Sequence, residues 1–349
     1  MTLNMADRQR RTTIVDVARA VGVSAKSVSR VLNGEPNVSP DLRDRVREAA
    51  RSLNYHPNAL AQALVRRRSY LLGLVYENPS PSYSVELQLG ALDRLKDERY
   101  HLVSLPIRSV REHADEVVPL LRAAALDGVI LAPPASDHPT VLDALDAVQL
   151  PYARIASTTM LERGPSIVLD DVEAARTIAE HVIGHGHRRI GIIKGNPAHP
   201  SSMARTLGYT QAMAGAGIEL RADWVEQGFY TFESGYEAAQ RLLARADRPT
   251  AILVQNDEMA VGALMAAREL GLALPEQLSI VGFDDSEVSR VAWPRLTTIR
   301  QPVYDMAVSA VDVLIRQLSG EPSQTLTAHR FELLVRDSVG PPPPANGQA

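Results

Sequence analysis

The sequence predicts a small all-α head followed by a larger α/β core. Three observations predict this fold class: apolar positions recur at helical spacing over residues 13–53, short apolar runs alternate with amphipathic segments from residue 70 onward, and the sign of the charge changes between the two parts. The length of 349 residues suits two or three domains. Apolar residues at 45% and charged residues at 22% argue against disorder and coiled coil.

The charge is unevenly distributed. Residues 1–69 contain 13 Lys and Arg against 6 Asp and Glu, whereas the remaining residues contain 24 against 35. The net charge of −4 therefore combines a basic head with an acidic core. This combination is typical of a polyanion-binding module joined to a domain that does not bind the polyanion. A basic disordered tail is the alternative, and the apolar pattern of the head argues against it.

Composition also bears on the compartment. The chain contains no cysteine, which excludes disulfides, zinc–thiolate sites and a cysteine nucleophile, and which fits a reducing compartment. The first eleven residues are polar and do not resemble a signal peptide. No apolar run approaches the roughly 18 residues that are needed to span a bilayer. We therefore expect a soluble, cytoplasmic protein without a membrane partner.

Three helices are predicted in the head. The first ends at Gly22, the second begins after an N-cap at Ser24, and the third begins at Ser39-Pro40. Apolar residues share one face of each helix: Ile14, Val17, Ala18 and Val21, then Val28, Val31 and Leu32, then Leu42, Val46, Ala49 and Ala50. Two helices joined by a short glycine-containing turn and supported by a third form a helix-turn-helix unit.

The second helix carries the candidate base-reading residues Ala25, Lys26 and Arg30 on the side away from its apolar face. Lys26 and Arg30 can donate to guanine O6 and N7 in the major groove, and Ala25 can contact a thymine methyl group. Each residue could instead contact a phosphate or face solvent. Helical hairpins of other functions share the apolar pattern, and the local positive charge favours DNA binding.

The core alternates predicted strands with predicted helices. The strands are 71–76, 101–105, 128–132, 152–155, 189–194, 251–255, 278–283 and 297–299, and the clearest helices are 85–98, 174–183, 234–243 and 259–270. This alternation implies parallel sheets that are covered on both faces, and the length fits two such sheets. Ligands of open α/β sheets bind at the carboxyl ends of the strands, so we expect a cleft between two lobes to be the binding site.

Motifs in both parts resemble the lactose-repressor (LacI/GalR) family of bacterial transcription regulators. In the head these are T-I-V-D-V-A-R-A-V-G-V-S-x-x-S-V-S-R-V-L-N, V-S-P-D-L-R-D-R-V and L-N-Y-H-P-N-A-L-A-Q-A-L. In the core they are G-H-R-R-I-G-I-I, R-x-x-G-Y, Q-N-D-E-M-A-V-G, S-I-V-G-F-D-D and P-R-L-T-T-I-R-Q-P. The resemblance covers about residues 12–340, nearly the whole chain.

The resemblance implies a domain organisation. It consists of a helix-turn-helix DNA-binding domain at 12–57, a hinge helix and linker at 58–69, and an effector-binding and dimerisation core at 70–340 with a two-lobed fold like that of periplasmic sugar-binding proteins. The N-lobe would contain about 70–168 and 300–327, and the C-lobe about 169–299 and 328–340. Residues 341–349 lack patterning and are expected to be disordered.

The resemblance also implies how DNA is bound. Leu64, in the hinge segment, would insert into the central base step of the minor groove and kink the duplex. A plain linker is the alternative interpretation of this segment. The candidate DNA-backbone contacts are Thr13, Ser29, Asn33 and Tyr55. The tail lacks the leucine heptads that add a tetramer in the lactose repressor, so we expect a homodimer on a palindromic double-stranded operator.

In the core, the resemblance places Arg205, Asn256 and Asp284 where the family holds effector hydroxyls. A guanidinium fork, an amide and a carboxylate can orient a polyol in a desolvated cleft. Tyr230 matches an aromatic that stacks on the effector. The alternative for Asn256 and Asp284 is that each caps the helix after its strand.

The chain departs from the family at two cleft positions. Ala156 replaces an aspartate found in many sugar-sensing members, and Arg154, on the same strand face, is expected to reach the cleft instead. The loop at 78–84 differs from the usual aromatic pair, which leaves Tyr83 as the cleft aromatic. The resemblance implies a sugar or glycoside effector, and these departures would tolerate an acidic or aromatic-bearing ligand, such as a glycoside, as readily as a bare hexose. Inducer and corepressor regulation both stay open, with an inducer favoured.

Enzymes and transport proteins are the rival classes. His181 and His185 share a helix face, but His187 lies beyond a glycine break, so we expect no metal site. The acidic pairs at 257–258 and 284–285 are adjacent residues that point to opposite sides, and no nucleophile or nucleotide-binding motif is present. We therefore expect no enzyme and no cofactor. A solute-binding protein would need a signal peptide in place of the helix-turn-helix.

Overall fold

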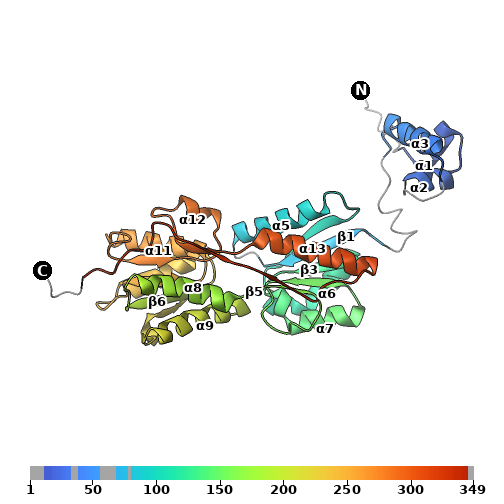
Figure 1. The fold of residues 1–349 in the computed structure, drawn as a ribbon. Helices are drawn as coiled ribbons and strands as arrows, with labels where there is room; N and C mark the ends of the chain where they lie inside the picture. The colour runs from blue at the N-terminus through green and yellow to red at the C-terminus, as the bar shows by residue number, and fades with distance from the viewer. Residues whose placement is uncertain (1–11, 33–37, 56–67, 78–79, 345–349) are drawn as a thin grey trace, which may run out of the picture. The chain divides into compact units, whose positions relative to one another are not determined.

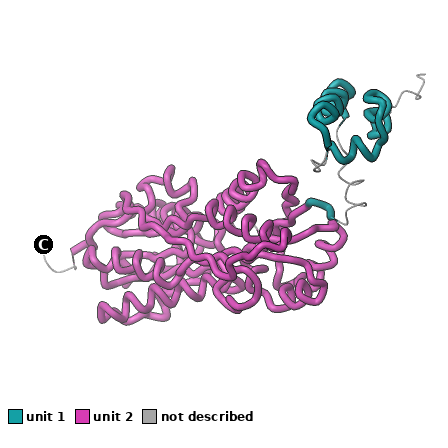
Figure 2. Tube along the Cα trace, turned by 45° about the vertical axis from the view of Figure 1, so that its right-hand side comes forward, with its two compact units in different colours: residues 1–70 teal, residues 71–349 magenta. Residues whose placement is uncertain are grey.

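The computed structural model describes residues 12–32, 38–55, 68–77 and 80–344 (Figure 1). The chain divides into two compact units, residues 1–70 and 71–349 (Figure 2). The first unit contains the all-α head and the second the two-sheet α/β core, so the predicted fold class is confirmed. Most of the expected hinge segment, including Leu64, lies outside the described residues, and so does Asn33.

The head consists of α1 (Ile14–Val21), α2 (Ala25–Leu32) and α3 (Pro40–Ser52). Gly22 ends α1 with a φ of 73°, a left-handed conformation that costs glycine little, and its N–H donates to the Ala18 carbonyl at 2.9 Å. At the start of α2, Ser24 Oγ accepts a hydrogen bond from the Ser27 N–H at 3.1 Å. The turn between the two helices is therefore stabilised at both ends by local hydrogen bonds.

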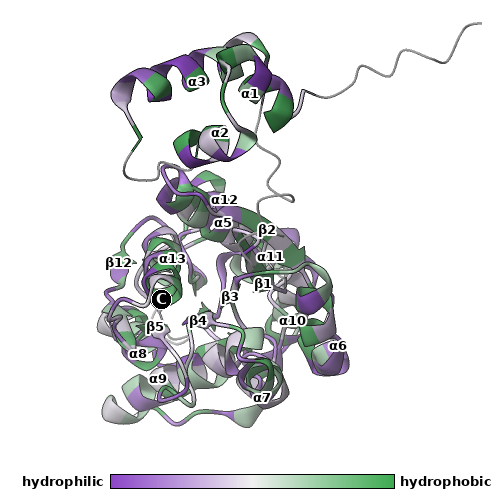
Figure 3. Cartoon of the chain, turned by 90° about the vertical axis from the view of Figure 1, so that its right-hand side faces the viewer, coloured by the Kyte–Doolittle hydropathy of each residue, from purple (hydrophilic) through white to green (hydrophobic). Residues whose placement is uncertain are grey.

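The three helices of the head share one apolar core. It is formed by Val17, Ala18, Val21, Val28, Val31, Val46 and Ala50. Figure 3 shows that each helix of the head carries both hydrophobic and hydrophilic residues. Arg45 on α3 donates to the Val21 carbonyl at 2.7 Å and so joins α3 to the end of α1. The short helices depend on this shared packing for their stability, because an isolated helix of eight residues is marginal in water.

The N-lobe is built on six parallel strands in the order β11-β5-β4-β3-β1-β2. These strands are β1 (Leu71–Tyr76), β2 (His101–Pro106), β3 (Gly128–Leu131), β4 (Tyr152–Ile155), β5 (Ser166–Leu169) and β11 (Leu326–His329). The helices α5 (Pro81–Leu95) and α13 (Val303–Ser319) lie side by side on one face, and α6 (Val110–Ala123) and α7 (Pro139–Val148) cover the other (Figure 1).

The C-lobe is built on four parallel strands in the order β7-β6-β8-β9. These are β6 (Ile190–Lys194), β7 (Val225–Gln227), β8 (Ala251–Val254) and β9 (Ser279–Val281). One apolar cluster joins the sheet to α8 (Asp171–Gly184) and α9 (Pro200–Gly215), and a second joins it to α10 (Phe232–Leu243) and α11 (Asp257–Glu269). The short helix α12 (Glu287–Val291) follows β9.

The chain passes between the lobes three times. The first passage follows β5, the second leads from β10 (Thr298–Arg300) to α13, and the third leads from β11 to β12 (Glu332–Leu334) in the dark red segment of Figure 1. The strands β10 and β12 pair antiparallel, with Ile299 opposite Leu333. Because the chain crosses between the lobes at three places, the lobes can change their angle while the register of each sheet stays intact.

All eight predicted strands of the core are present, each within a few residues of its expected bounds. The strands β5, β7, β11 and β12 were not predicted. Both β11 and β12 consist of exposed and half-buried residues, so neither has the fully buried apolar run that marks a central strand. Beyond β12, the Gly340 N–H donates to Ser279 Oγ at 3.0 Å, which holds the chain against the C-lobe just before the proline-rich tail.

Close helix packing generates a stability prediction. A methyl group on Gly208 of α9 would lie 2.2 Å from the Val172 carbonyl oxygen of α8. We expect Gly208→Ala to lower the free energy of unfolding by about 1–3 kcal/mol, because the backbones of α8 and α9 must move apart to make room for the added methyl group. Gly215→Ala, at the end of the same helix, meets nothing within 4 Å and is the control. Urea denaturation measures both variants, and equal stability would contradict the close approach.

Candidate functional sites

The exposed side of α2 carries the candidate base-reading residues. Lys26 is exposed, and Arg30 is half-buried. Ala25 is also half-buried and packs against the head core, so its methyl group is less available to a ligand than the sequence suggests. Lys26 therefore is the most accessible of the three.

The candidate backbone contacts lie at helix ends of the head. Thr13 precedes α1, where its N–H and hydroxyl donate to Asp16 Oδ2 at 2.9 and 2.7 Å. Tyr55 follows α3 and packs against the head core, and partial burial raises the pKa of its hydroxyl. Ser29 is half-buried on α2. Their roles toward DNA stay predictions.

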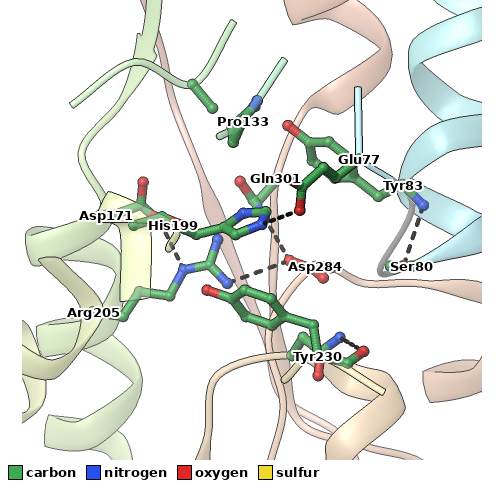
Figure 4. A pocket seen from close by; sticks show the side chains of 13 residues that line it. Glu77, Ser80, Tyr83, Pro133, Asp171, His199, Arg205, Tyr230, Asp284 and Gln301 are labelled. Carbon is green, nitrogen blue, oxygen red and sulfur yellow. Dashed lines mark hydrogen bonds and ion pairs between the residues drawn. The ribbon is translucent and has the colours of Figure 1, made fainter. Parts of the chain in front are cut away.

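The core contains a cavity between the two lobes, at the carboxyl ends of the strands (Figure 4). It is lined by Glu77, Ser80, Tyr83, Pro133, Ala156, Asp171, His199, Ser201, Arg205, Tyr230, Asn256, Asp284 and Gln301. Each lining residue lies in the segment that follows a strand, which is where parallel α/β sheets bind ligands. The empty space of the cavity, including the open solvent that adjoins it, amounts to about 510 Å³.

Arg205 lies on α9 at the centre of the polar wall. Its Nε donates to Asp171 Oδ1 at 2.8 Å, and one terminal nitrogen donates to the Gln255 carbonyl at 2.6 Å. The same terminal nitrogen lies 3.7 Å from Asp284 Oδ1, and the guanidinium carbon lies 3.7 Å from the centre of the Phe283 ring. Arg205 is therefore fixed by hydrogen bonds on its edge and by an aromatic face beneath it.

Asp284 follows β9 and accepts a hydrogen bond from Gln301 Nε2 at 2.5 Å. Burial raises the pKa of its carboxyl group well above the ordinary value, and Arg205 only partly offsets this effect. Its φ of 117° is rare for a residue with a side chain. Ser286, rather than Asp284, precedes α12 as its N-cap, so the capping alternative does not hold for Asp284.

Asn256 lines the cavity and also caps α11. Its side-chain oxygen accepts a hydrogen bond from the Met259 N–H at 3.0 Å, and its amide nitrogen donates to the Tyr230 carbonyl at 3.0 Å and to Glu258. The capping interpretation is therefore confirmed, and it uses most of the hydrogen-bonding capacity of the amide.

The aromatic side of the cavity contains Tyr83, Tyr230 and His199. The Tyr230 and His199 rings pack edge to face, with centroids 5.3 Å apart. Tyr230 has a φ of 66° and packs on Gly195. A Cβ added to Gly195 would lie 2.1 Å from the Tyr230 ring. The Tyr230 hydroxyl and His199 Nε2 are buried without a hydrogen-bond partner among the described residues. Burial raises the pKa of both tyrosine hydroxyls.

Two polar contacts connect the lobes at the cavity. Ser80, before α5, donates to Glu258 Oε1 of α11 at 2.7 Å. Glu77, directly after β1, places Oε2 3.7 Å from His199 Nε2 (Figure 4). Burial raises the pKa of Glu258. A ligand in this cavity would contact residues whose positions depend on the angle between the lobes.

The expectation that Arg154 reaches the cleft was wrong. Arg154 is fully buried and does not line the cavity. Its terminal nitrogens donate to Asp137 Oδ1 at 2.9 Å and to the carbonyls of Met160, Thr159 and Arg163, and its Nε donates to the Ser136 carbonyl. The guanidinium therefore holds the loop after β4 in place, and its charge is matched by Asp137 rather than by a ligand.

Sequence reasoning missed several cavity residues, namely Glu77, Ser80, Pro133, Asp171, His199, Ser201 and Gln301. Glu77 directly follows a predicted strand, so its position was a usable signal. Asp171 follows β5, which was not predicted. Ala156 does line the cavity, with a φ of 50°, and places no polar group there.

Over residues 12–32, 38–55, 68–77 and 80–344, the chain contains no group of three or more acidic or histidine side chains arranged to hold a metal ion. The same residues also contain no helix with the length and apolar character that a bilayer requires.

Together, the head and the core define a protein with a helix-turn-helix domain and a two-lobed α/β core. Residues 13–58 match the model of bacterial regulatory proteins of the lacI family, and residues 179–339 match a periplasmic binding protein-like domain. Catabolite control protein A of Priestia megaterium is 33% identical, with 92% of this chain and 97% of that protein covered. The chain therefore belongs to the LacI family of bacterial transcription regulators.

Solved structures agree with this assignment. The Lac repressor dimer bound to operator and an anti-inducer superposes with a TM-score of 0.84 at 28% identity, covering 95% of this chain and all of that chain. The CelR–cellobiose complex superposes with a TM-score of 0.71 at 30% identity, covering 94% of this chain and all of that chain. The chain is thus similar over nearly its full length to regulators that bind DNA or a disaccharide.

The contacts of Arg154 generate a second stability prediction. Asp137→Ala leaves a buried guanidinium without its counter-charge, so we expect the free energy of unfolding to fall by about 3–5 kcal/mol. Asp143→Ala is the matched control, because Asp143 pairs with Arg163 at the surface and should contribute about 1 kcal/mol or less. Thermal and urea denaturation measure both variants. A loss for Asp137→Ala no larger than that of the control would contradict the structural role of Arg154.

Proposed function

We propose that this LacI-family regulator represses carbohydrate-utilisation genes in the cytoplasm and is released from a palindromic operator by a sugar or glycoside. The effector would bind in the cavity between the lobes. The head would read each half-site through Lys26 and Arg30, with Ala25 in a lesser role. Most of the affinity would come from contacts to phosphates, so binding falls steeply with salt.

The observation that carries the proposal is the chemistry of the cavity walls. Arg205, Asp284 and Gln301 present charged and amide groups to the cavity, and Tyr83 and Tyr230 present aromatic rings to it. Polyol hydroxyl groups can donate to the carboxylate and accept from the guanidinium, while aromatic rings cover the apolar faces of a sugar. The cellobiose named for CelR supports a sugar as the ligand class.

Exposed apolar residues support a homodimer. Val85, Leu89 and Leu92 follow one another at helical spacing along α5, each about half exposed. Val291 and Trp293, around the end of α12, are each about three-quarters exposed. Apolar patches of this kind are covered in assemblies, and a two-fold interface would bury both copies at once. A symmetric dimer matches a palindromic operator.

The proposed mechanism is a shift between two lobe arrangements. The interlobe contacts Ser80–Glu258 and Glu77–His199 lie at the cavity, so a ligand that binds there has different contacts in each arrangement. Such a difference in affinity is what a ligand needs to shift a conformational equilibrium. Ligand binding would favour the arrangement in which two heads cannot engage one operator.

A pair of variants tests the proposal. We expect Asp284→Ala to keep operator binding and to lose the response to the effector by at least tenfold, because the carboxylate that accepts ligand hydroxyls is gone. Lys26→Ala should do the reverse, with weaker operator binding and unchanged ligand binding. Fluorescence anisotropy of labelled operator and calorimetry with the sugar measure the two properties. Wild-type release of operator from Asp284→Ala would place the effector elsewhere.

A further inference from the structure

The charges around the interlobe cavity are unbalanced. Three carboxyl groups line it, from Glu77, Asp171 and Asp284, and Arg205 is the one Lys or Arg among the described lining residues. Burial raises the pKa of Asp171 and Asp284, and neither group adds a positive charge in either protonation state. All four side chains are largely buried, with exposed fractions of 12% or less.

The charge of Arg205 is already compensated. Its guanidinium is hydrogen-bonded to Asp171 at 2.8 Å and lies 3.7 Å from Asp284. An anionic ligand would have to compete with two buried carboxylates for this one cation. Such competition is costly in a desolvated site, because a buried anion without a positively charged partner is strongly disfavoured next to other anions.

Glu77 faces His199, the one histidine among the described residues that line the cavity. One of its oxygens accepts a hydrogen bond from the Val110 N–H at 2.5 Å, and the other lies 3.7 Å from His199 Nε2. The Glu77 carboxylate therefore lies against the His199 ring, so His199 offers a ligand no uncompensated cation.

A larger hollow adjoins the cavity and continues the same charge pattern. The two share Tyr83, Asp284 and Gln301 as lining residues. The hollow adds the carboxylates of Glu86, Glu287 and Asp305 and the guanidinium groups of Arg290 and Arg300. Both arginines are bound to the buried carboxylate of Asp285, at 2.9 and 2.8 Å. The described surroundings of the cavity therefore also contain more carboxylates than guanidinium groups.

We propose that this cavity selects an uncharged sugar or glycoside and rejects the same sugar when it carries a phosphate or a carboxylate. This inference rests on the proposed function and names the ligand class of that site. The partners that remain for a ligand suit hydroxyl groups. The Tyr230 hydroxyl and His199 Nε2 are buried, line the cavity and have no hydrogen-bond partner among the described residues. Carboxylate oxygens accept hydrogen bonds from hydroxyl groups and repel phosphate.

The test compares matched ligands on the full-length protein by calorimetry. The neutral probes are glucose, galactose and cellobiose. The anionic probes are the 6-phosphates and the uronic acids of glucose and galactose. We expect an uncharged sugar to bind at least tenfold more tightly than its anionic counterparts, a difference of about 1.4 kcal/mol. An anionic member that binds as tightly as its neutral counterpart overturns the charge selection and leaves a sugar effector standing. If the protein binds none of these sugars and binds a purine base instead, both the proposed sugar effector and the proposed charge selection are overturned.

A charge variant tests the cause of the selection. Glu77→Gln keeps an acceptor for the Val110 N–H and removes one negative charge, so the preference for the neutral sugar should shrink by threefold or more. Glu276→Gln, an exposed position outside the cavity, is the control and should leave the preference unchanged. An unchanged preference in Glu77→Gln, with the protein folded and the neutral sugar still bound, would overturn the electrostatic explanation.

Discussion

The arrangement of the core depends on the buried ion pairs of Arg205. This side chain joins α9 to Asp171 at the start of α8 and approaches Asp284 after β9, so three segments that are distant in the sequence meet at one guanidinium. Removing one partner of a buried pair leaves an uncompensated charge, so these residues constrain one another. The close packing of Gly208 against α8 lets α9 hold Arg205 at this depth.

The position of this ion-pair cluster connects binding to regulation. It lies where the carboxyl ends of the strands in both lobes face one cavity, and Asp171 and Gln301, next to two of the three passages between the lobes, line that cavity. A ligand there contacts both lobes at once. A ligand that changes the affinity of the heads for DNA must have different contacts in two lobe arrangements, and a ligand in this cavity would meet that condition.

The sequence predicts much of this molecule, and its failures have physical causes. Apolar runs located the buried strands, whereas β11 and β12 are half exposed and lack such runs. Family motifs pointed to Arg205 and Asp284, which do line the cavity. The cleft position predicted for Arg154 came from the alternation of side chains along its strand. That alternation shows only which face of the sheet a side chain lies on. It cannot show that the buried guanidinium is already satisfied by Asp137 and loop carbonyls.

The central claim is that the cavity and the DNA-binding head are energetically coupled. The most direct measurement is the affinity of the full-length protein for its tightest-binding sugar, with and without a DNA fragment that the protein has selected from a random pool. Coupling is reciprocal, so the factor by which DNA changes the sugar affinity must equal the factor by which the sugar changes the DNA affinity. We predict that each ligand weakens the other by the same factor, tenfold or more. Sugar affinity that is identical with and without bound DNA would contradict the account.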